Sequence, residues 1–216
     1  MDVFVRLVLL ALLALSSNAA PGHEACNLMK KVTEEDMRML IKSRWVLVEA
    51  FSDFEYGVAL LSNASSSVVE MSLNSDNKTF LFVERNIVNG KCLTYYVNMS
   101  APDPETSNHT LHLLGPGVQD LDGHVTPYDD QGKTDTYLTC PHCLTIIYNM
   151  VFDGIQGRML LIYRQEGKHQ DAEELRAAQS SHRVTAECLN FIVTKNFKYD
   201  GTADFCEKKK EEESEG

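Results

Sequence analysis

The sequence predicts an all-β protein: an eight-stranded antiparallel up-and-down barrel with one C-terminal α-helix packed on its outside. Three observations lead to this fold class. Runs rich in β-branched and aromatic residues follow one another along most of the chain, short segments rich in Gly, Pro and Asn separate them, and one charged helical stretch comes after the last long run. A barrel of about eight strands can hold one small ligand in its interior.

The N-terminal segment has the pattern of a secretory signal. Arg6 precedes an apolar run over residues 7–15, and the small residues Ser17 and Ala19 occupy the two positions that a signal peptidase inspects. The run is too short to cross a bilayer, which takes about 20 apolar residues. We therefore expect a secreted, extracellular protein without a membrane span, divided into a signal peptide over residues 1–19, one barrel domain over 20–200 and a charged tail over 201–216.

The strands can be assigned in order along the chain. A polar segment over residues 33–41, with Thr33 as a candidate N-cap, predicts a short helix that closes one end of the barrel. The first strand, over residues 44–53, contains the single Trp of the chain, Trp45, and both of its faces are mostly apolar. Further strands are predicted over residues 67–73, 79–88, 91–100, 110–114, 136–140, 144–152 and 158–164.

Turn residues assign the connections between these strands. Asn89-Gly90 is the strongest two-residue hairpin signal. The segment with Tyr56, Gly57 and Asn63 is a predicted loop, and the Gly, Pro and Asp content of residues 115–133 predicts a second, mobile loop.

The C-terminal part predicts a helix and a final apolar run. Residues 169–181 have small or apolar residues at three-residue spacing with charges between them, so one weakly apolar face can lie on the barrel. Residues 188–193 form the last apolar run before the charged tail.

Four Asn-x-Ser/Thr sequons behind a signal peptide predict a glycosylated surface: Asn63, Asn77, Asn98 and Asn108. The alternative is that some of them are never used. A glycosylated Asn faces outward, so Asn77 and Asn98 fix which residues of the adjoining strands face inward. Alternation then predicts a ligand-binding interior made of Leu47, Glu49, Phe51, Phe80, Phe82, Glu84, Leu93, Tyr95 and Val97. Filling the core explains each aromatic member equally well.

The two carboxylates in that interior set suggest the chemistry of a ligand. Glu49 and Glu84 would be costly in a dry core, so we expect them near the open mouth of the barrel or facing a cation. Aromatic faces combined with carboxylates suit a guanidinium or a protonated amine. Solvated charges at the rim of the barrel are the alternative.

Charge and composition exclude several other functions. A formal net charge of −11 at pH 7 argues against nucleic acid and anionic lipid surfaces as partners. His109, His112, His124 and His142 show no metal-ligand spacing, and no Ser or Cys has a recognisable activating context. We therefore expect no metal, no cofactor and no catalysis, and take a monomer that binds a small molecule as the expected state.

Six Cys residues in a secreted chain predict three disulfides, which on counting alone could pair in 15 ways. The motif Cys140-Pro141-His142-Cys143 also occurs in thiol oxidoreductases, where a helix begins at the first Cys. The alternative is a structural clip, because a β-turn brings its end residues within disulfide reach and Pro favours the second turn position. Residues 144–152 have the composition of a strand, which favours the clip over the redox site.

Three motifs together resemble the lipocalin signatures. Ser43-Arg44-Trp45 at the head of the first strand, after a short polar helical run, is similar to the Gly-x-Trp of the first signature, with Ser in place of Gly. Thr134-Asp135-Thr136-Tyr137 loosely resembles the second signature, and Arg164 matches the Arg of the third. The resemblance implies that Trp45 and Arg164 meet at the barrel floor, with the guanidinium over the indole as a cation–π pair; a solvated strand-end Arg is the alternative.

Within the lipocalins, the chain is similar to the group of alpha-1-acid glycoprotein (orosomucoid) and the saxitoxin- and tetrodotoxin-binding proteins. The similarity covers almost the whole chain after residue 19 and rests on Cys26-Asn27-Leu28, Cys92, Glu187-Cys188-Leu189, Cys206-Glu207 and the block 75–86. It implies the disulfides Cys26–Cys188 and Cys92–Cys206. The parity set by Asn98 also turns Cys92 outward, where it can reach a tail that lies on the barrel wall.

The resemblance implies a secreted carrier of a small lipophilic or cationic molecule, in the manner of toxin-binding or acute-phase plasma proteins. Two alternatives stay open on the sequence. The protein could be an immune-modulatory glycoprotein that acts through its outer surface, or a thiol oxidoreductase that acts through Cys140 and Cys143.

Overall fold

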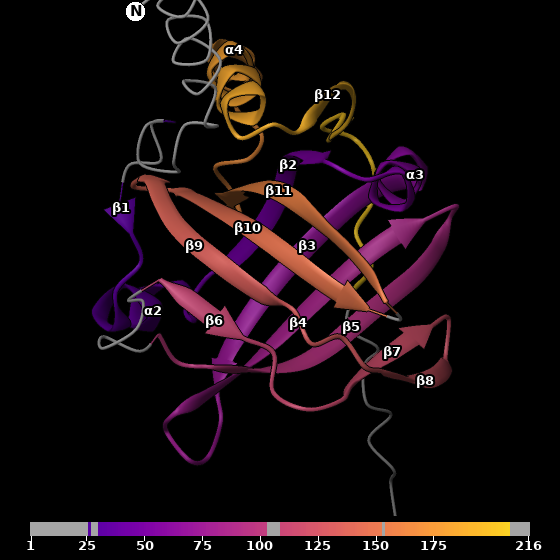
Figure 1. Ribbon diagram of the computed structural model, residues 1–216. Coiled ribbons are helices and arrows are strands. Elements are labelled where there is room, and N and C mark those ends of the chain that lie inside the picture. Colours follow the sequence, from indigo (N-terminus) through magenta and orange to yellow (C-terminus); the bar gives the residue numbers. More distant parts are fainter. Residues whose placement is uncertain (1–25, 27–29, 103–108, 153, 208–216) are drawn as a thin grey trace, which may run out of the picture.

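The computed structural model describes residue 26 and residues 30–102, 109–152 and 154–207 (Figure 1). The predicted signal peptide, the sequon at Asn108 and residues 208–216 of the charged tail lie outside the described residues. Within the described ranges, no helix has the length and apolar character needed to cross a membrane.

A curved antiparallel sheet forms the body of the protein (Figure 1). Its main strands, in order, are β2 (Arg44–Ser52), β3 (Ala64–Leu73), β4 (Thr79–Val88), β5 (Lys91–Ser100), β6 (Thr110–His112), β9 (Lys133–Cys140), β10 (Cys143–Phe152) and β11 (Ile155–Gln165). Strands β2 to β5 pair in order, β6 pairs with β9, and β9 to β11 pair in order before β11 returns to pair with β2. Strands β5 and β6 are joined by a bridge from Met99 to Leu113, just after β6, and by a hydrogen bond from the His112 backbone N–H to the Ser100 hydroxyl. The predicted up-and-down barrel is confirmed.

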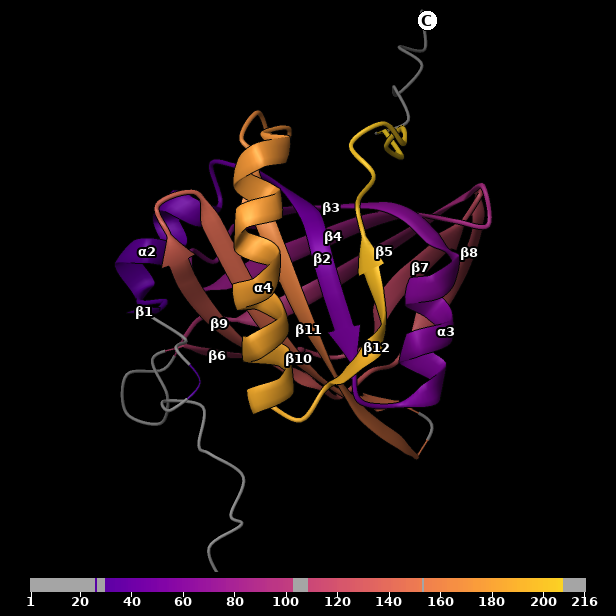
Figure 2. The ribbon, with the colours of Figure 1, turned by 90° about the horizontal axis from the view of Figure 1, so that it is seen from above.

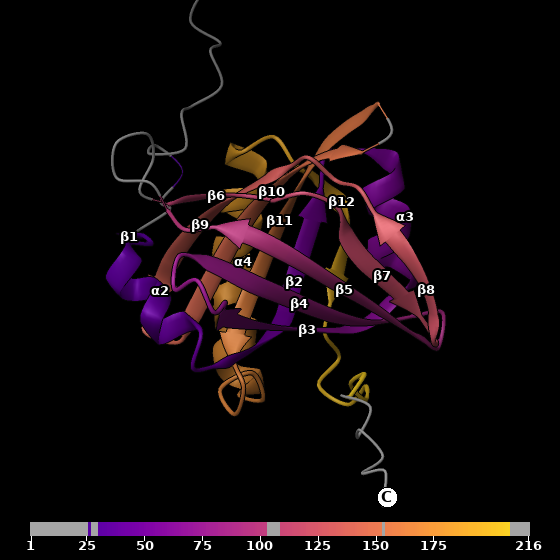
Figure 3. The same ribbon diagram turned by 90° about the horizontal axis from the view of Figure 1, so that it is seen from below.

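A hairpin replaces the predicted mobile loop at residues 115–133. Strands β7 (Gly117–Leu121) and β8 (His124–Tyr128) pair with each other, and β7 pairs with β5 (Figure 3). The turn between them contains Asp122 and Gly123, both with positive φ (51° and 96°). Asp-Gly is a strong hairpin signal, so the prediction of a loop was wrong because it weighed overall Gly and Pro content above that dipeptide.

The short helix at the start of the domain forms as predicted. Helix α2 (Glu34–Leu40) begins after Thr33, whose hydroxyl accepts a hydrogen bond from the Asp36 backbone N–H while the Asp36 carboxylate accepts one from the Thr33 backbone N–H. This capping box satisfies two backbone donors at the helix start. Strand β1 (Lys30–Lys31) precedes the helix and pairs with β9.

Helix α3 (Glu55–Asn63) occupies the segment that was predicted to be a loop. Gly57 explains how the helix fits: a Cβ at this position would collide with Ser52 Oγ and with the Phe54 ring. The residue that suggested a turn in the sequence therefore permits a close approach between a helix and the end of β2.

Helix α4 (Ala172–Cys188) lies along the outside of the barrel, and strand β12 (Ile192–Lys198) follows it and pairs with β2 (Figure 2). Asp171 caps the helix start by accepting from the backbone N–H groups of Glu173 and Glu174. Apolar residues of β2, β9, β10 and β11 form one buried cluster with the end of the helix: Val48, Phe51, Tyr137, Ile147, Leu160, Ile162, Ala186, Leu189 and Phe191. The predicted outer helix is confirmed, although it ends at Cys188 rather than Ser181.

Three disulfides connect distant parts of this architecture. Cys26–Cys188 joins the N-terminal segment to the end of α4, and Cys92–Cys206 joins β5 to the C-terminal segment. Cys140–Cys143 closes the turn between β9 and β10, with 4.7 Å between the Cα atoms. A strand, rather than a helix, follows Cys143, which is the arrangement predicted for a structural clip.

Candidate functional site

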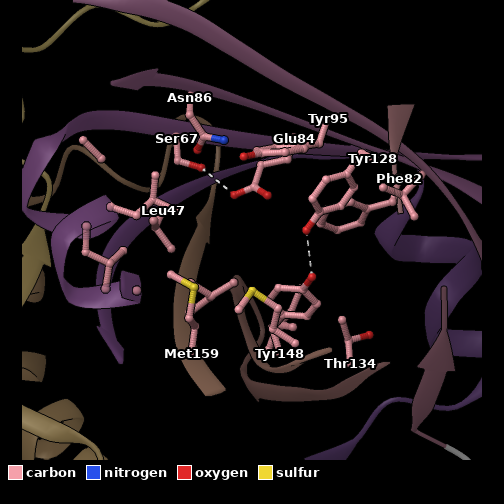
Figure 4. Close-up of a pocket in the computed structure, with 18 of the residues that line it drawn as sticks. Leu47, Ser67, Phe82, Glu84, Asn86, Tyr95, Tyr128, Thr134, Tyr148 and Met159 are labelled. Atoms are coloured by element: carbon pink, nitrogen blue, oxygen red, sulfur yellow. Dashed lines mark hydrogen bonds between the residues drawn. The ribbon is translucent and has the colours of Figure 1, made fainter. Parts of the chain in front are cut away.

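A cavity of about 150 Å³ lies inside the barrel, lined by side chains from the barrel strands, from α3 and from the β7–β8 hairpin (Figure 4). Tyr56 of α3 lines this cavity and is 64% exposed, so the cavity reaches the surface beside α3. An apolar cavity of about this volume accommodates a ring the size of benzene. The interior is therefore a ligand-sized space with an entrance.

Most of the interior set predicted from β4 and β5 does face inward. The predicted residues that line the cavity are Leu47, Phe82, Glu84, Tyr95 and Val97. Phe80 and Leu93 are buried, at 4% and 8% exposure, but neither lines the cavity. Phe80 packs in the barrel core with Trp45, so it fills space rather than offering a surface to a ligand.

The prediction that Glu49 and Phe51 face the cavity is wrong. The pairing of β11 with β2 shifts by one residue: Tyr163 lies opposite Leu47, and Ile162 lies opposite Glu49. Val48 is the extra residue of this bulge, which interrupts the alternation of β2. Leu47 consequently faces the interior, whereas Glu49 and Phe51 face the outer wall under α4.

Glu49 has partners on that outer wall. One carboxylate oxygen lies 2.8 Å from Nδ1 of His182 on α4, and the other accepts a hydrogen bond from the Asn196 side chain of β12 at 2.9 Å. The Glu49 side chain is 7% exposed and that of His182 is 16% exposed. Glu49 thus connects the barrel wall to the two outer elements and is not available to a ligand in the cavity.

Arg164 does not stack on Trp45, which corrects the expected barrel floor. Trp45 pairs in register with Gln165, so Arg164 lies on the opposite face of the sheet. Its Nη1 contacts Glu174 Oε1 of α4 at 2.6 Å and Cys140 Sγ at 3.4 Å. Among the described residues, the cation–π contacts are Arg44 over Phe205 and Arg158 over Phe191.

Trp45 itself belongs to the interior core. It is 3% exposed, and its indole N–H donates to the Leu40 carbonyl at the end of α2, 3.1 Å away. This contact ties the closing helix to the first barrel strand. Trp45 is therefore a structural residue at the closed end.

Glu84 is the carboxylate that faces the cavity (Figure 4). The Ser67 hydroxyl donates to it at 3.3 Å, and the Asn86 side chain also hydrogen-bonds to it. Burial raises the pKa of Glu84 from 4.5 to about 7, and these two hydrogen bonds offset only part of that rise. Across the described ranges, no Lys, Arg or His forms an ion pair with Glu84.

A second polar group borders the same cavity. The hydroxyls of Tyr128 and Tyr148 lie 3.0 Å apart, and both tyrosines line the cavity (Figure 4). Both also donate to Asp130, which is 2% exposed. Burial is the main cause that raises the pKa of each tyrosine well above its usual value, and the neighbouring Asp130 charge adds to the rise, so both hydroxyls keep their protons.

Sequence reasoning missed these tyrosines and the α3 residues that border the cavity. Ile146, Tyr148 and Met150 alternate along β10 and all line the cavity, but no sequon lies near β10 to fix its parity. Tyr128 belongs to the hairpin that was predicted to be a loop. Tyr56 belongs to the helix that was predicted to be a loop, so no pattern assigned it an inward face.

Solved structures with similar coordinates identify the fold as that of the lipocalins. The siderocalin Q83 matches with a TM-score of 0.56 at 12% identity, over 81% of this chain and 97% of that one. Aphrodisin, a pheromone of the female hamster, matches with a TM-score of 0.51 at 10% identity, over 76% of this chain and 97% of that one. A dog lipocalin allergen matches with a TM-score of 0.50 at 14% identity, over 76% of this chain and 95% of that one. The chain therefore has a lipocalin fold, as its signatures suggested.

Sequence comparison finds two similar proteins from one species of fish, Takifugu pardalis. The chain is 38% identical over 208 residues, or 95% of its length, to saxitoxin and tetrodotoxin-binding protein 1 of Takifugu pardalis, and 37% identical over 208 residues to protein 2 of that species. The matched region is 50% of each of these proteins, so the chain spans about half the length of the curated relatives it matches. No protein-family model matches the chain.

Proposed function

We propose that this protein is a secreted carrier that binds a small cationic molecule, a guanidinium or protonated amine with an apolar body, in the barrel cavity. The observation that carries this proposal is Glu84, a carboxylate that faces an otherwise largely apolar cavity and forms no ion pair among the described residues. The names of the two Takifugu relatives, which state that they bind saxitoxin and tetrodotoxin, support small-molecule binding.

The physical argument for a cation starts from the cost of ionising Glu84. The raised pKa, about 7, means that the apo cavity destabilises the charged carboxylate. A cation placed beside it recovers that cost through a charge-assisted hydrogen bond. The aromatic rings of Phe82 and Tyr95 line the same cavity and offer faces for the apolar body or for a cation–π contact. A neutral ligand would gain the apolar contact alone.

Secretion is supported by the predicted signal peptide and by the three disulfides, because disulfides persist in oxidising compartments. The sequon residues Asn63, Asn77 and Asn98 are exposed, which leaves each of them accessible to glycosylation. These exposed sequons also favour a second candidate function, an immune-modulatory glycoprotein that acts through its outer wall. That function requires no ligand in the cavity.

A matched ligand pair tests the carrier proposal. Benzylguanidinium and benzylurea have nearly the same shape, but only the first is charged. By titration calorimetry on the disulfide-bonded protein at about pH 8, we expect the cation to bind at least about tenfold more tightly, because a hydrogen bond to a charged group is worth about 1.5–3 kcal/mol.

Two variants and one change of pH assign that preference to Glu84. Glu84→Gln should remove the preference for the cation, whereas Glu49→Gln, on the outer wall, should keep it. With a pKa of about 7 in the free protein, affinity for the guanidinium should fall about tenfold between about pH 8 and about pH 6. Equal affinities for the two ligands, or loss of the preference in Glu49→Gln alone, would contradict the proposal.

A further inference from the structure

The hydrogen-bonding direction of the tyrosine pair narrows the class of ligand. Tyr128 comes from β8 and Tyr148 from β10, and their hydroxyl oxygens meet at the cavity 3.0 Å apart (Figure 4). A Tyr hydroxyl carries one proton to donate and also has lone pairs that accept. Which of these two capacities a ligand meets depends on where the protons already point.

Asp130 and the contact between the two tyrosines use both hydroxyl protons. Oδ2 of Asp130 accepts from the Tyr128 hydroxyl at 2.9 Å and from the Tyr148 hydroxyl, while its Oδ1 accepts from the backbone N–H groups of Gly132, at 2.7 Å, and Val151, at 3.2 Å. Four donors therefore hold a carboxylate that is 2% exposed. The contacts with Asp130 and the 3.0 Å contact between the two hydroxyls together use both tyrosine protons, so the two oxygens offer lone pairs to the cavity.

The polar groups around Glu84 likewise leave hydrogen-bond acceptors facing the cavity. The Ser67 hydroxyl and the Asn86 side chain already hydrogen-bond to the Glu84 carboxylate, so the Ser67 proton and one N–H of the Asn86 amide are engaged. An ionised Glu84 then presents further lone pairs to the cavity. These two polar places, on β4 and on the β8–β10 side, thus both accept hydrogen bonds, and Tyr56, Gln119 and Thr134 are further polar residues on the cavity wall.

We infer that the carried molecule has hydrogen-bond donors at two separate places: a guanidinium or ammonium group for Glu84, and a hydroxyl or N–H group for the Tyr128–Tyr148 pair. This inference rests on the proposed function, since it adds a second recognition point to the same cavity. A ligand that offers an ether or carbonyl oxygen to the tyrosine pair meets another acceptor and is disfavoured, because both groups lose water without gaining a hydrogen bond.

Three cations that differ at one end test this second point. The probes are benzylguanidinium and its para-hydroxymethyl and para-methoxymethyl derivatives, with the homologues extended by one or two methylenes to allow for the span of the cavity. In at least one homologous pair, the hydroxyl compound should bind about fivefold more tightly than its methyl ether, which is the effect of one hydrogen bond of about 1 kcal/mol.

Tyrosine variants locate that selectivity. Tyr148→Phe should reduce the ratio between hydroxyl and methyl ether to near one, and because this ratio is measured within one variant, a change in the overall affinity of that variant does not alter it. Tyr96→Phe is the matched control, because Tyr96 lies on the outer side of β5 and is 38% exposed; it should leave the ratio unchanged. Thermal melting of each variant shows whether it is folded.

Asp130→Asn provides a second test that a purely steric contact would not pass. An amide nitrogen in place of Oδ2 donates to the tyrosines, so at least one of their protons is released toward the cavity while the remaining amide oxygen still accepts from Gly132 and Val151. The preference should then invert, with the methyl ether binding more tightly than the hydroxyl compound.

The outcomes separate this inference from the proposed function. If benzylguanidinium does not bind in preference to benzylurea, the proposed function fails. If that preference is present and depends on Glu84, but no homologous pair distinguishes hydroxyl from methyl ether, the inference about the tyrosine pair alone is overturned. A ratio that persists in Tyr148→Phe, or that Asp130→Asn leaves unchanged, overturns it as well.

Discussion

Glu49 and Glu84 are two carboxylates of the same barrel wall with opposite surroundings. Glu49 lies on the outer side, where His182 and Asn196 hold both of its oxygens. Glu84 lies on the inner side, where burial raises its pKa to about 7 and, among the described residues, no ion pair forms. On the outer side, protein groups therefore hydrogen-bond to both oxygens of Glu49. On the inner side, protein groups compensate the charge of Glu84 only in part.

This difference teaches that burial alone does not mark a binding residue in a barrel. Glu49 is as deeply buried as a core residue, at 5% exposure, yet its position is explained by its attachment of α4 and β12. Glu84 differs because, among the described residues, no cationic side chain forms an ion pair with it. Four tests can sharpen or break this contrast between the outer and inner sides.

The largest effect is expected for the aromatic residues of the two sides. Phe51 is 1% exposed in the cluster under α4, so Phe51→Ala should lower the free energy of unfolding by about 3–5 kcal/mol and leave ligand affinity unchanged. Phe82→Ala, beside the cavity, should lower it less and weaken binding of benzylguanidinium. Urea denaturation and calorimetry measure the two quantities; a reversed pattern would break the contrast.

His182→Ala should lower the free energy of unfolding by about 2–3 kcal/mol, because it leaves a buried carboxylate with one of its two partners. The double variant His182→Ala with Glu49→Gln should recover part of this loss, since it removes the unpaired charge. Equal stabilities of the single and double variants in urea would show that the contact carries no electrostatic energy.

Glu84→Gln should have the opposite sign and increase stability at neutral and higher pH. The folded-state pKa of about 7 lies above the unfolded value of 4.5, so the folded protein retains a proton that the unfolded chain has lost, and stability falls as pH rises from about 4.5 to about 7. Gln removes this loss. We expect a gain of about 1–2 kcal/mol above about pH 7, smaller than the full shift implies because the carboxylate still faces the cavity.

Stability measured in urea across that pH range checks the prediction. The wild type should lose stability between about pH 4.5 and about pH 7 relative to Glu84→Gln, and the two curves should meet at the acid end. Parallel curves would mean that Glu84 ionises normally.

The smallest effect concerns Tyr163, whose hydroxyl is buried inside the barrel and has no hydrogen-bond partner within the described part of the chain. Burial and the charge of Glu84 raise its pKa well above the usual value. Tyr163→Phe removes an unsatisfied polar atom and should raise the unfolding free energy by about 0.5–1 kcal/mol. A loss of stability on thermal melting would instead indicate that the hydroxyl has a partner in solution.

The sequence predicted the inner wall best where strands pair without interruption. Residues of β4 and β5 pair continuously from Thr79–Ser100 to Val88–Lys91. The parity set by the sequons at Asn77 and Asn98 therefore held along both strands and placed Glu84 and Tyr95 inward. The bulge at Val48 broke the same reasoning on β2, because a bulge depends on how two distant strands fit and leaves no mark on local alternation.

Other parts of the site depended on tertiary contacts that no local pattern contains. Tyr128 and Tyr148 are 20 positions apart and meet at Asp130 only because the hairpin after β6 folds back on the barrel. Arg164 was assigned to the floor from its motif, but its register beside Val46 turns it toward α4. The fold class was predictable from strand number and turns, whereas these placements required the closed sheet.

Gly57 affects how fast a ligand can enter and leave the barrel cavity. Any side chain at this position would push α3 away from Ser52 and Phe54, and α3 contributes Tyr56, Leu60 and Leu61 to the edge of the cavity. Gly57→Ala should therefore widen the entrance of the cavity. Association and dissociation of the ligand should both become faster, while the residues that recognise the ligand stay in place. The residence time of a bound ligand would then depend on the absence of a single methyl group at Gly57.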